Sequence, residues 1–302
     1  MKAERVSRIA TTEFVTRYLE AGRPVIVTDA MEDWPAFGQW TPDYFAREYG
    51  DWKVPVYGHY FDLLKLMKLG DYIRTYMGSE PPPDIRYVRW FTLHQPVPNA
   101  ERFPWADEVF KLLQPQWSHP YFLPTDSYLF PFCPPGRTLD VPSETTVPSK
   151  ALYLSCKGAT TNLHLDYWGA DAVLCQLHGQ KQLVLYSPDQ TPLLMDPATD
   201  AVRGASGGRR VVDIRNPDRA AFPDFDKAQP TVLDVLNPGE IAYIPAGWLH
   251  HVDTLSDSIT LTWNFVHLAS WRNWFRFLTN EPPASELADI GHILLDDPRR
   301  LH

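Results

Sequence analysis

Cysteine is scarce in this chain, since only Cys133, Cys156 and Cys175 occur among 302 residues. An odd number of cysteines without zinc-motif spacing argues against a disulfide framework and against a cysteine metal site. The sequence therefore favours a reducing compartment.

Long hydrophobic runs are also missing. No apolar stretch approaches the roughly 20 residues that a membrane-spanning helix needs. The first charged residues, among them Lys2, Arg5 and Arg8, are not followed by the apolar segment of a secretion signal. We therefore expect a soluble protein, cytoplasmic or otherwise intracellular, with no membrane partner.

The chain has fewer positively than negatively charged residues. The chain has 28 lysines and arginines against 37 aspartates and glutamates, for a formal net charge of −9. Such a balance opposes binding to a polyanion unless a local basic patch exists. It disfavours nucleic acid as a partner and leaves a protein, a peptide or a small molecule.

What the chain does contain is typical of a folded globular protein, with 44% hydrophobic and 22% charged residues. Its 11 tryptophans and 29 prolines indicate short strands with rigid connections more than long helices. A chain of this length can bury a substantial core.

Closely spaced strands are predicted from residue 150 onward. Turn signals such as Lys157-Gly158 and Pro238-Gly239 separate eight short apolar or alternating segments. The segments are residues 151–155, 161–166, 172–177, 182–186, 231–236, 240–244, 250–254 and 259–266. They predict a mainly β fold with flanking helices, organised as a double-sheet jelly roll whose mouth could hold a ligand.

Three regions follow from this pattern. Residues 1–149 form a mixed α/β region packed on the barrel, with a helix expected at 61–77. Residues 150–267 form the jelly roll, interrupted at 196–230 by a solvated loop. Residues 268–302 form a helical segment, whose apolar face either covers the barrel or pairs with a second copy to make a homodimer.

The most informative motif is His164-Leu165-Asp166, with His250 far downstream in a strand context. On an extended segment, period-2 alternation puts His164 and Asp166 on one side and Leu165 on the other. A third ligand must come from another strand, and His250 is placed to supply it. Two imidazoles and one carboxylate can occupy one face of an octahedral Fe(II) and leave the other face open.

Lys181 is the next informative residue, because it begins a predicted strand. If it points inward, it is a buried ammonium that needs an anion, and a dicarboxylate such as 2-oxoglutarate would supply one. Thr161 and Tyr153 could add hydroxyl groups, and Asn264 shares strand parity with Thr262. The alternative is a lysine exposed at a turn.

Several ordered blocks resemble the Jumonji C, cupin-like 2-oxoglutarate hydroxylases, and in particular the group of the asparaginyl hydroxylase that acts on hypoxia-inducible factor. The blocks are Thr161-Asn-Leu-His164-Leu-Asp166, Gln176-Leu-His-Gly179-Gln-Lys181, Pro238-Gly239-Glu-Ile-Ala-Tyr-Ile-Pro245, Trp248-Leu-His250-His251 and Thr262-Trp-Asn264-Phe265. The resemblance implies a double-stranded β-helix and Fe(II) bound by His164, Asp166 and His250. It also implies that Lys181 and Thr161 hold the distal carboxylate of 2-oxoglutarate, with Asn264 in the same pocket.

The chain departs from the family in two places. Relatives often carry an asparagine between the aspartate ligand and the lysine, where this chain has Ala170-Asp171-Ala172, and the segment from Asp166 to Lys181 is slightly longer here. Both departures concern the co-substrate contacts and the substrate-side mouth, and not the triad.

The predicted function is a 2-oxoglutarate-dependent dioxygenase that hydroxylates a C–H bond of a protein, peptide or small molecule, with His164, Asp166 and His250 as its catalytic metal ligands. Tyr167, Trp168 and Trp248 are candidates for lining the substrate entrance, or else belong to the core. The alternative is a non-catalytic cupin-type binding protein, or a metal-dependent cupin enzyme that does not use 2-oxoglutarate.

Overall fold

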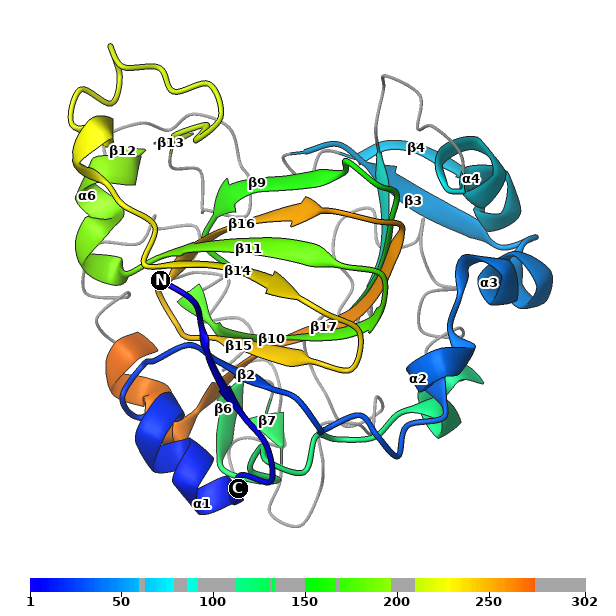
Figure 1. Cartoon of the computed structure of the whole chain (residues 1–302), viewed down its shortest axis with the longest axis horizontal. Coiled ribbons are helices and arrows are strands. Elements are labelled where there is room, and N and C mark those ends of the chain that lie inside the picture. Colours follow the sequence, from blue (N-terminus) through cyan, green and yellow to red (C-terminus); the bar gives the residue numbers. More distant parts are fainter. Residues whose placement is uncertain are drawn as a thin grey trace.

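The computed structural model of this chain describes residues 1–59, 63–78, 86–91, 112–130, 132–133, 150–166, 169–196 and 210–274. Within these ranges, two β-sheets face each other and form the centre of the molecule (Figure 1). The smaller sheet has the order β14-β11-β16-β9. Its strands are Val232–Leu236 (β14), Lys181–Tyr186 (β11), Leu249–Thr254 (β16) and Thr160–His164 (β9).

The larger sheet has the order β1-β2-β15-β10-β17-β8-β5-β3-β4. Its strands are Glu4–Val6 (β1), Val25–Val27 (β2), Ile241–Ile244 (β15), Asp171–His178 (β10), Ser258–His267 (β17), Lys150–Ser155 (β8), Tyr87–Phe91 (β5), Lys53–Tyr57 (β3) and Leu63–Lys68 (β4). Two short strands, Tyr128–Phe130 (β6) and Phe132–Cys133 (β7), continue from the end of β17. A separate pair is formed by Met195–Asp196 (β12) and Arg210–Val211 (β13).

The eight strands predicted from residue 150 onward are all present, and their bounds agree within two residues. The mainly β prediction with a jelly-roll centre is therefore confirmed. Successive side chains of a strand point to opposite faces, so burial alternates along β14, where Leu233 is exposed and Leu236 is buried. β10 is buried on both faces because it lies in the middle of the large sheet.

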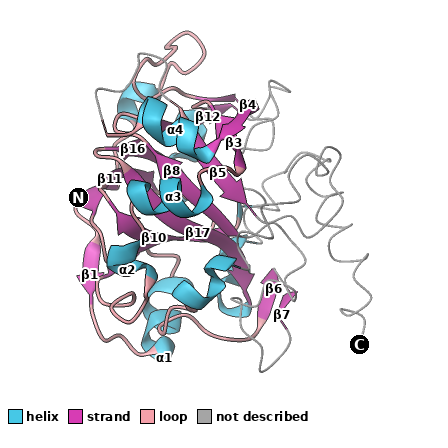
Figure 2. Cartoon of the chain, turned by 90° about the vertical axis from the view of Figure 1, so that its right-hand side faces the viewer, coloured by secondary structure: helices cyan, strands magenta, loops and turns pink. Residues whose placement is uncertain are grey.

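Helices cover the outer face of the large sheet, and Figure 2 shows α2, α3 and α4 over it. The N-terminal helical elements are Thr11–Phe14 (α1), the π-helical turn Val15–Leu19 (η1), Ala36–Gln39 (α2), Pro42–Tyr49 (α3) and Leu69–Tyr76 (α4). Helix α3 begins as its sequence predicts, because the Thr41 hydroxyl accepts a 3.1 Å hydrogen bond from the Tyr44 backbone N–H and Pro42 follows it. The remaining short helical elements are Gln114–Gln116 (η3), Pro188–Gln190 (η6), Thr191–Leu194 (α6), Phe225–Lys227 (η7) and Leu268–Ser270 (η8).

The helix predicted at 61–77 is wrong in its first part. Residues Leu63–Lys68 form β4, which pairs antiparallel with β3 from Lys53↔Lys68 to Tyr57↔Leu63. The apolar spacing suits a helix, but β3 offers backbone donors and acceptors that a paired strand satisfies. Helical structure begins only at Leu69.

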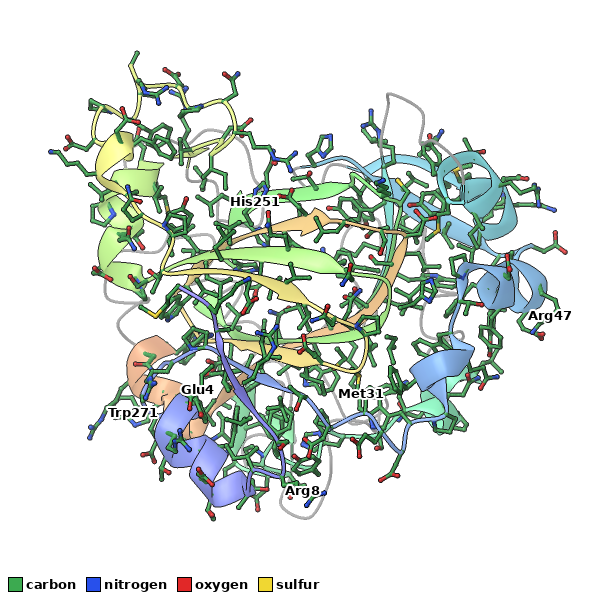
Figure 3. All side chains as sticks on the ribbon, in the orientation of Figure 1. Glu4, Arg8, Met31, Arg47, His251 and Trp271 are labelled. Atoms are coloured by element: carbon green, nitrogen blue, oxygen red, sulfur yellow. The ribbon has the colours of Figure 1, made fainter. Side chains whose placement is uncertain are left out.

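Of the four apolar clusters found among the described residues, three are large enough to hold these layers together. The largest joins the helices to the outer face of the large sheet and includes Trp40, Trp90 and Trp263. A second fills part of the space between the sheets, and Figure 3 shows how densely side chains occupy that space. The third lies outside the small sheet and buries Val212 and Phe222. In the predicted solvated loop at 196–230, most of the described residues from 210 onward are exposed or half-buried, and the prediction is wrong for the residues that this cluster buries. Residues 197–209 lie outside the described residues.

Within the part of the chain that the structure describes, we find no helix with the length and apolar character required to cross a membrane. The division of the chain at residues 149/150 and 267/268 stays a prediction. Most of the predicted C-terminal helical segment, from residue 275 onward, lies outside the described residues, and so does its proposed role in a homodimer.

Candidate metal centre and co-substrate pocket

His164 and His250 lie directly opposite each other on the neighbouring strands β9 and β16. The next paired residues are Thr161 and Val252, so three positions of β9 span two positions of β16. This β-bulge puts Thr161 and His164 on the same face of the sheet although they are three residues apart. Both line a single pocket between the two sheets.

Both imidazoles are held in one orientation by the backbone. The Nδ1 atom of His164 lies 2.7 Å from the carbonyl oxygen of Asn162, and Nδ1 of His250 lies 3.1 Å from that of Trp248. A carbonyl only accepts, so each Nδ1 carries the proton and donates it. Each Nε2 is then left with a lone pair, as a metal ligand requires.

Asp166 completes the group just after β9 ends. Its carboxylate oxygens lie 3.9 Å from Nε2 of His164 and 3.6 Å from Nε2 of His250. One ligand atom from each of the three residues lies within 4.8 Å of the others, so the group could hold a metal ion. Leu165 points away and is buried in the cluster outside the small sheet, as alternation predicts.

Burial keeps His164 in the form that a metal needs. Desolvation, followed by the nearby His250, lowers the pKa of His164 well below 6.5. Neutral imidazole is the ligand form, so no proton has to be removed from His164 before a metal binds. Two imidazoles and one carboxylate around an open face suit Fe(II).

The next histidine along β16 faces the opposite direction. Nε2 of His251 lies 3.0 Å from a carboxylate oxygen of Asp253, outside the pocket. The choice of His250 over His251 therefore agrees with strand alternation.

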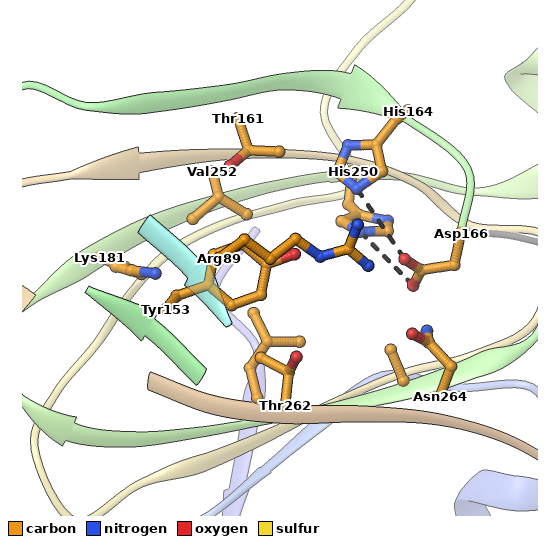
Figure 4. Close-up of a pocket in the computed structure, with 12 residues that line it drawn as sticks. Arg89, Tyr153, Thr161, His164, Asp166, Lys181, His250, Val252, Thr262 and Asn264 are labelled. Atoms are coloured by element: carbon orange, nitrogen blue, oxygen red, sulfur yellow. Dashed lines mark ion pairs between the residues drawn. The ribbon is translucent and has the colours of Figure 1, made fainter. Parts of the chain in front are cut away.

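Lys181 lies at the other end of the same pocket (Figure 4). It is only 5% exposed, and burial lowers its pKa to about 7. Its ammonium group lies 5.3 Å from the ring centre of Tyr153, which stands on β8 of the opposite sheet. The prediction of an inward lysine is confirmed, and the alternative of an exposed turn lysine is wrong.

The structure brings together all seven residues singled out from the sequence. Each of them lines this pocket: Tyr153, Thr161, His164, Asp166, Lys181, His250 and Asn264. Trp248 instead packs in the cluster between the sheets, and its indole N–H donates a 3.1 Å hydrogen bond to the Gly22 carbonyl. Tyr167 and Trp168 lie outside the described residues.

A model of the family described as cupin-like domain matches residues 10–270. The chain belongs to this family. The match begins at residue 10, well before the predicted jelly roll, so the cupin-like unit includes β2 and the helices on the large sheet.

Three named relatives of this cupin-like chain are similar to it, and in each the match covers about half of the relative or less. It is 25% identical to the arginine-specific demethylase JMJ22 of Arabidopsis thaliana, over 94% of this chain and 49% of that protein. It is 26% identical to lysine-specific demethylase 8 of Danio rerio, over 83% of this chain and 55% of that protein. It is 31% identical to the 2-oxoglutarate and iron-dependent oxygenase JMJD4 of Gallus gallus, over 43% of this chain and 29% of that protein.

The chain thus spans about half the length of the first two of these relatives. The predicted Jumonji C, cupin-like membership is confirmed by the family match and by these names. The particular likeness to the asparaginyl hydroxylase group stays a prediction.

Sequence reasoning missed Arg89, which stands on β5 and lines the pocket of this cupin-like chain. It precedes the predicted jelly-roll segments by about 60 residues of sequence. The usable signal is a charged residue inside the otherwise apolar and aromatic run Tyr87-Val-Arg-Trp-Phe91.

Asp171, at the point of departure from the family pattern, supports the His250 strand instead of lining the pocket. Its carboxylate accepts hydrogen bonds from the Tyr243 hydroxyl at 2.7 Å, the Ala246 backbone N–H at 2.9 Å and the Ser270 hydroxyl at 2.6 Å. Ala246 lies in the turn that leads into β16. Asp171 therefore fixes the start of the strand that carries His250.

Replacing Asp171 with asparagine is expected to remove the free-energy cost of ionising a buried carboxyl group, which depends on pH. Burial raises the pKa of Asp171 from 3.8 to about 6, so the folded state retains a proton that the unfolded chain has lost. The stability that protonated Asp171 contributes to the folded state is fully present below pH 3.8 and is lost as the pH rises through about 6. Relative to wild type, D171N should gain about 1 kcal/mol between about pH 5 and pH 7.5. Urea unfolding of the metal-free proteins measures this, and a difference that does not vary with pH would contradict it.

Proposed function

We propose that this chain is an Fe(II)- and 2-oxoglutarate-dependent oxygenase that hydroxylates a C–H bond of a protein, peptide or small-molecule substrate. The observation that carries the proposal is the convergence of His164, Asp166 and His250 at one end of a pocket that has buried Lys181 at the other. A metal-binding cupin without a dicarboxylate co-substrate has no need of a buried ammonium there.

Each pocket residue has a distinct part in the proposal. His164, Asp166 and His250 hold Fe(II) on one face, and Lys181 and Thr161 hold the distal carboxylate of 2-oxoglutarate. Tyr153 packs beside the lysine ammonium, and Asn264 shares the pocket on the Asp166 side (Figure 4). When bound, iron and 2-oxoglutarate supply the oxidation of a C–H bond by O2, with 2-oxoglutarate converted to succinate and CO2. The protein contributes orientation and exclusion of water.

The direct test is succinate formation from 2-oxoglutarate by the iron-loaded protein in air. Slow turnover is expected without substrate, and an increase is expected when peptide or metabolite pools include the substrate. Mass spectrometry should then find one added oxygen atom in that substrate. A protein that binds the metal but neither binds nor consumes 2-oxoglutarate would instead be a metal-binding cupin that does not use this co-substrate.

The relatives named as demethylases favour a protein or peptide substrate. Demethylation uses the same chemistry, because a hydroxylated N-methyl group breaks down to an amine and formaldehyde. Formaldehyde measured in the same assay therefore separates demethylation from hydroxylation of a carbon that is not bound to nitrogen. We also propose that residues 268–302 cover the barrel or pair with a second copy, which sedimentation of the full chain would distinguish.

A further inference from the structure

Gln176 is a buried polar residue on β10 that the proposed chemistry does not use. Its side chain is fully buried, and it lies on the same face of the strand as Leu174, which lines the pocket. Gln176 pairs with Thr260 of β17, just as Leu174 pairs with Thr262. Figure 4 shows Asn264 on the Asp166 side of the pocket and Thr262 further toward Lys181. Gln176 and Thr260 continue this row between the two sheets, toward the lysine end.

The amide group of Gln176 holds the turn that follows β10. Its Nε2 donates hydrogen bonds to the carbonyl oxygens of His178 at 2.7 Å and Gly179 at 2.9 Å. Its Oε1 accepts a 2.8 Å hydrogen bond from the Thr260 hydroxyl, which is also buried. The orientation of the amide is fixed, because the opposite orientation would place its oxygen against two carbonyl oxygens that can only accept.

The same turn is held a second time by the turn between β16 and β17. The Ser256 hydroxyl accepts a 2.9 Å hydrogen bond from the Gln180 backbone N–H. Gly179 has a positive φ of 68°, and a Cβ at this position would lie 2.0 Å from the Asp257 carbonyl oxygen. The chain therefore has one close-fitting path from β10 into β11.

Lys181 is the first residue of β11, two residues after Gly179. Its side chain is 5% exposed, and its ammonium group lies 5.3 Å from the ring centre of Tyr153. A buried side chain packed in this way has little room to compensate for a shift of its own backbone. The position of the ammonium group in the pocket thus depends on the turn that Gln176 holds.

We propose that Gln176 is a positioning residue for Lys181, and that it sets the preference of the protein for a dicarboxylate co-substrate. The proposal rests on the proposed function, because it assigns the distal carboxylate of 2-oxoglutarate to Lys181. The Gln176 amide touches neither the metal ligands nor the co-substrate. It holds the turn so that the ammonium group meets the distal carboxylate, and a displacement of about 1 Å is enough to weaken such a site.

Two ligands that differ only at the distal end test the proposal. 2-Oxopentanoate has the five carbons and the chelating end of 2-oxoglutarate, with a methyl group in place of the distal carboxylate. By calorimetry on the Mn(II)-loaded protein, wild type should bind 2-oxoglutarate at least about 100-fold more tightly than 2-oxopentanoate. Residues that orient a metal ligand typically contribute about 10- to 100-fold to affinity, and we expect Q176M to reduce this preference about tenfold. Its affinities for Mn(II) and 2-oxopentanoate should stay within about threefold of wild type.

A double-mutant cycle separates positioning from a general effect on the fold. If Gln176 acts through Lys181, adding Q176M to K181M should change the affinity for 2-oxoglutarate by less than about twofold. Gln180 provides the matched control, because it lies in the same turn and its amide donates a 2.8 Å hydrogen bond to Asn237 on the exposed side. Q180M should keep the wild-type preference.

The variant T260V provides a second, milder test. It removes the hydroxyl that binds the Gln176 oxygen and leaves both amide donors in place, so the preference should fall about threefold. Thermal unfolding shows whether each variant is folded. If Q176M does not fold, T260V decides, and an unchanged preference in folded T260V contradicts the proposal.

The remaining outcomes are distinguishable. Folded Q176M with the wild-type preference, even if less stable, would mean that Gln176 only stabilises the turn, and the proposed function would stand. Equal weakening of Mn(II), 2-oxopentanoate and 2-oxoglutarate would show a general disturbance and overturn the positioning role. A wild-type protein that does not prefer 2-oxoglutarate would contradict the proposed function itself.

Discussion

Replacing Lys181 with methionine is expected to stabilise the metal-free protein. The lysine has a pKa of 10.5 in the unfolded chain, and burial lowers it to about 7 in the folded protein. Between these values the unfolded chain binds the additional proton, so the folded state loses stability as the pH falls toward 7. The full cost below pH 7 is about 5 kcal/mol, and methionine of similar length removes it.

Urea unfolding at two pH values measures this effect. The advantage of K181M over wild type should be a few kcal/mol at about pH 6.5 and about 2 kcal/mol smaller at about pH 9, where the buried lysine is already neutral. Lys157 is an exposed lysine at a turn, and K157M should leave stability nearly unchanged. Destabilisation of K181M at both pH values would mean that the ammonium group is already neutralised within the fold.

The same substitution should abolish useful affinity for 2-oxoglutarate. A buried carboxylate that loses its cation costs about 3 kcal/mol or more, which corresponds to at least about 100-fold in the dissociation constant. Calorimetry with the Mn(II)-loaded protein measures this binding. An unchanged affinity in K181M would show that the distal carboxylate binds elsewhere. Stability and binding therefore change in opposite directions at this one position.

Replacing Asp166 or His250 with alanine is expected to remove metal binding. Each residue supplies one of three ligand atoms that lie within 4.8 Å of one another. Losing a residue that supports a ligand typically costs 10- to 100-fold in metal affinity, so losing a ligand itself should cost at least about 100-fold. Succinate formation should disappear along with the metal. Calorimetric titration with Mn(II) measures the affinity directly.

His251 provides the matched control for His250. It stands on the same strand, is equally buried and points to Asp253 on the opposite face. H251Q should bind Mn(II) nearly as wild type does, provided that thermal unfolding shows a folded protein. Equal loss of the metal in folded H251Q and in H250A would contradict the ligand assignment.

Much of this site could be predicted because strand alternation is a local rule. His164, Leu165 and Asp166 alternate as a strand requires, and Leu165 indeed lies in an apolar cluster. A charged lysine is costly to bury without an anion, so an inward Lys181 indicated an anionic co-substrate before any fold was known. These arguments use only neighbouring residues or a single side chain.

What could not be predicted depends on partners distant in sequence. The bulge between His164 and Thr161 exists only through the pairing of β9 with β16. Arg89 enters the pocket because β5 lies beside β8, and β4 is a strand because β3 offers it an edge. No local pattern contains these pairings, and the apolar spacing at residues 63–68 even favours a helix.

The two sheets divide the pocket between them. His164, His250, Thr161 and Lys181 all stand on the small sheet, whereas Arg89, Tyr153, Thr262 and Asn264 stand on the large one. Among the residues drawn in the pocket, those on the large sheet supply none of the three metal-ligand atoms. Substitutions at Thr262 or Asn264 are therefore expected to leave the His164, Asp166 and His250 group in place, whereas Asp171 on the same sheet supports the strand of His250.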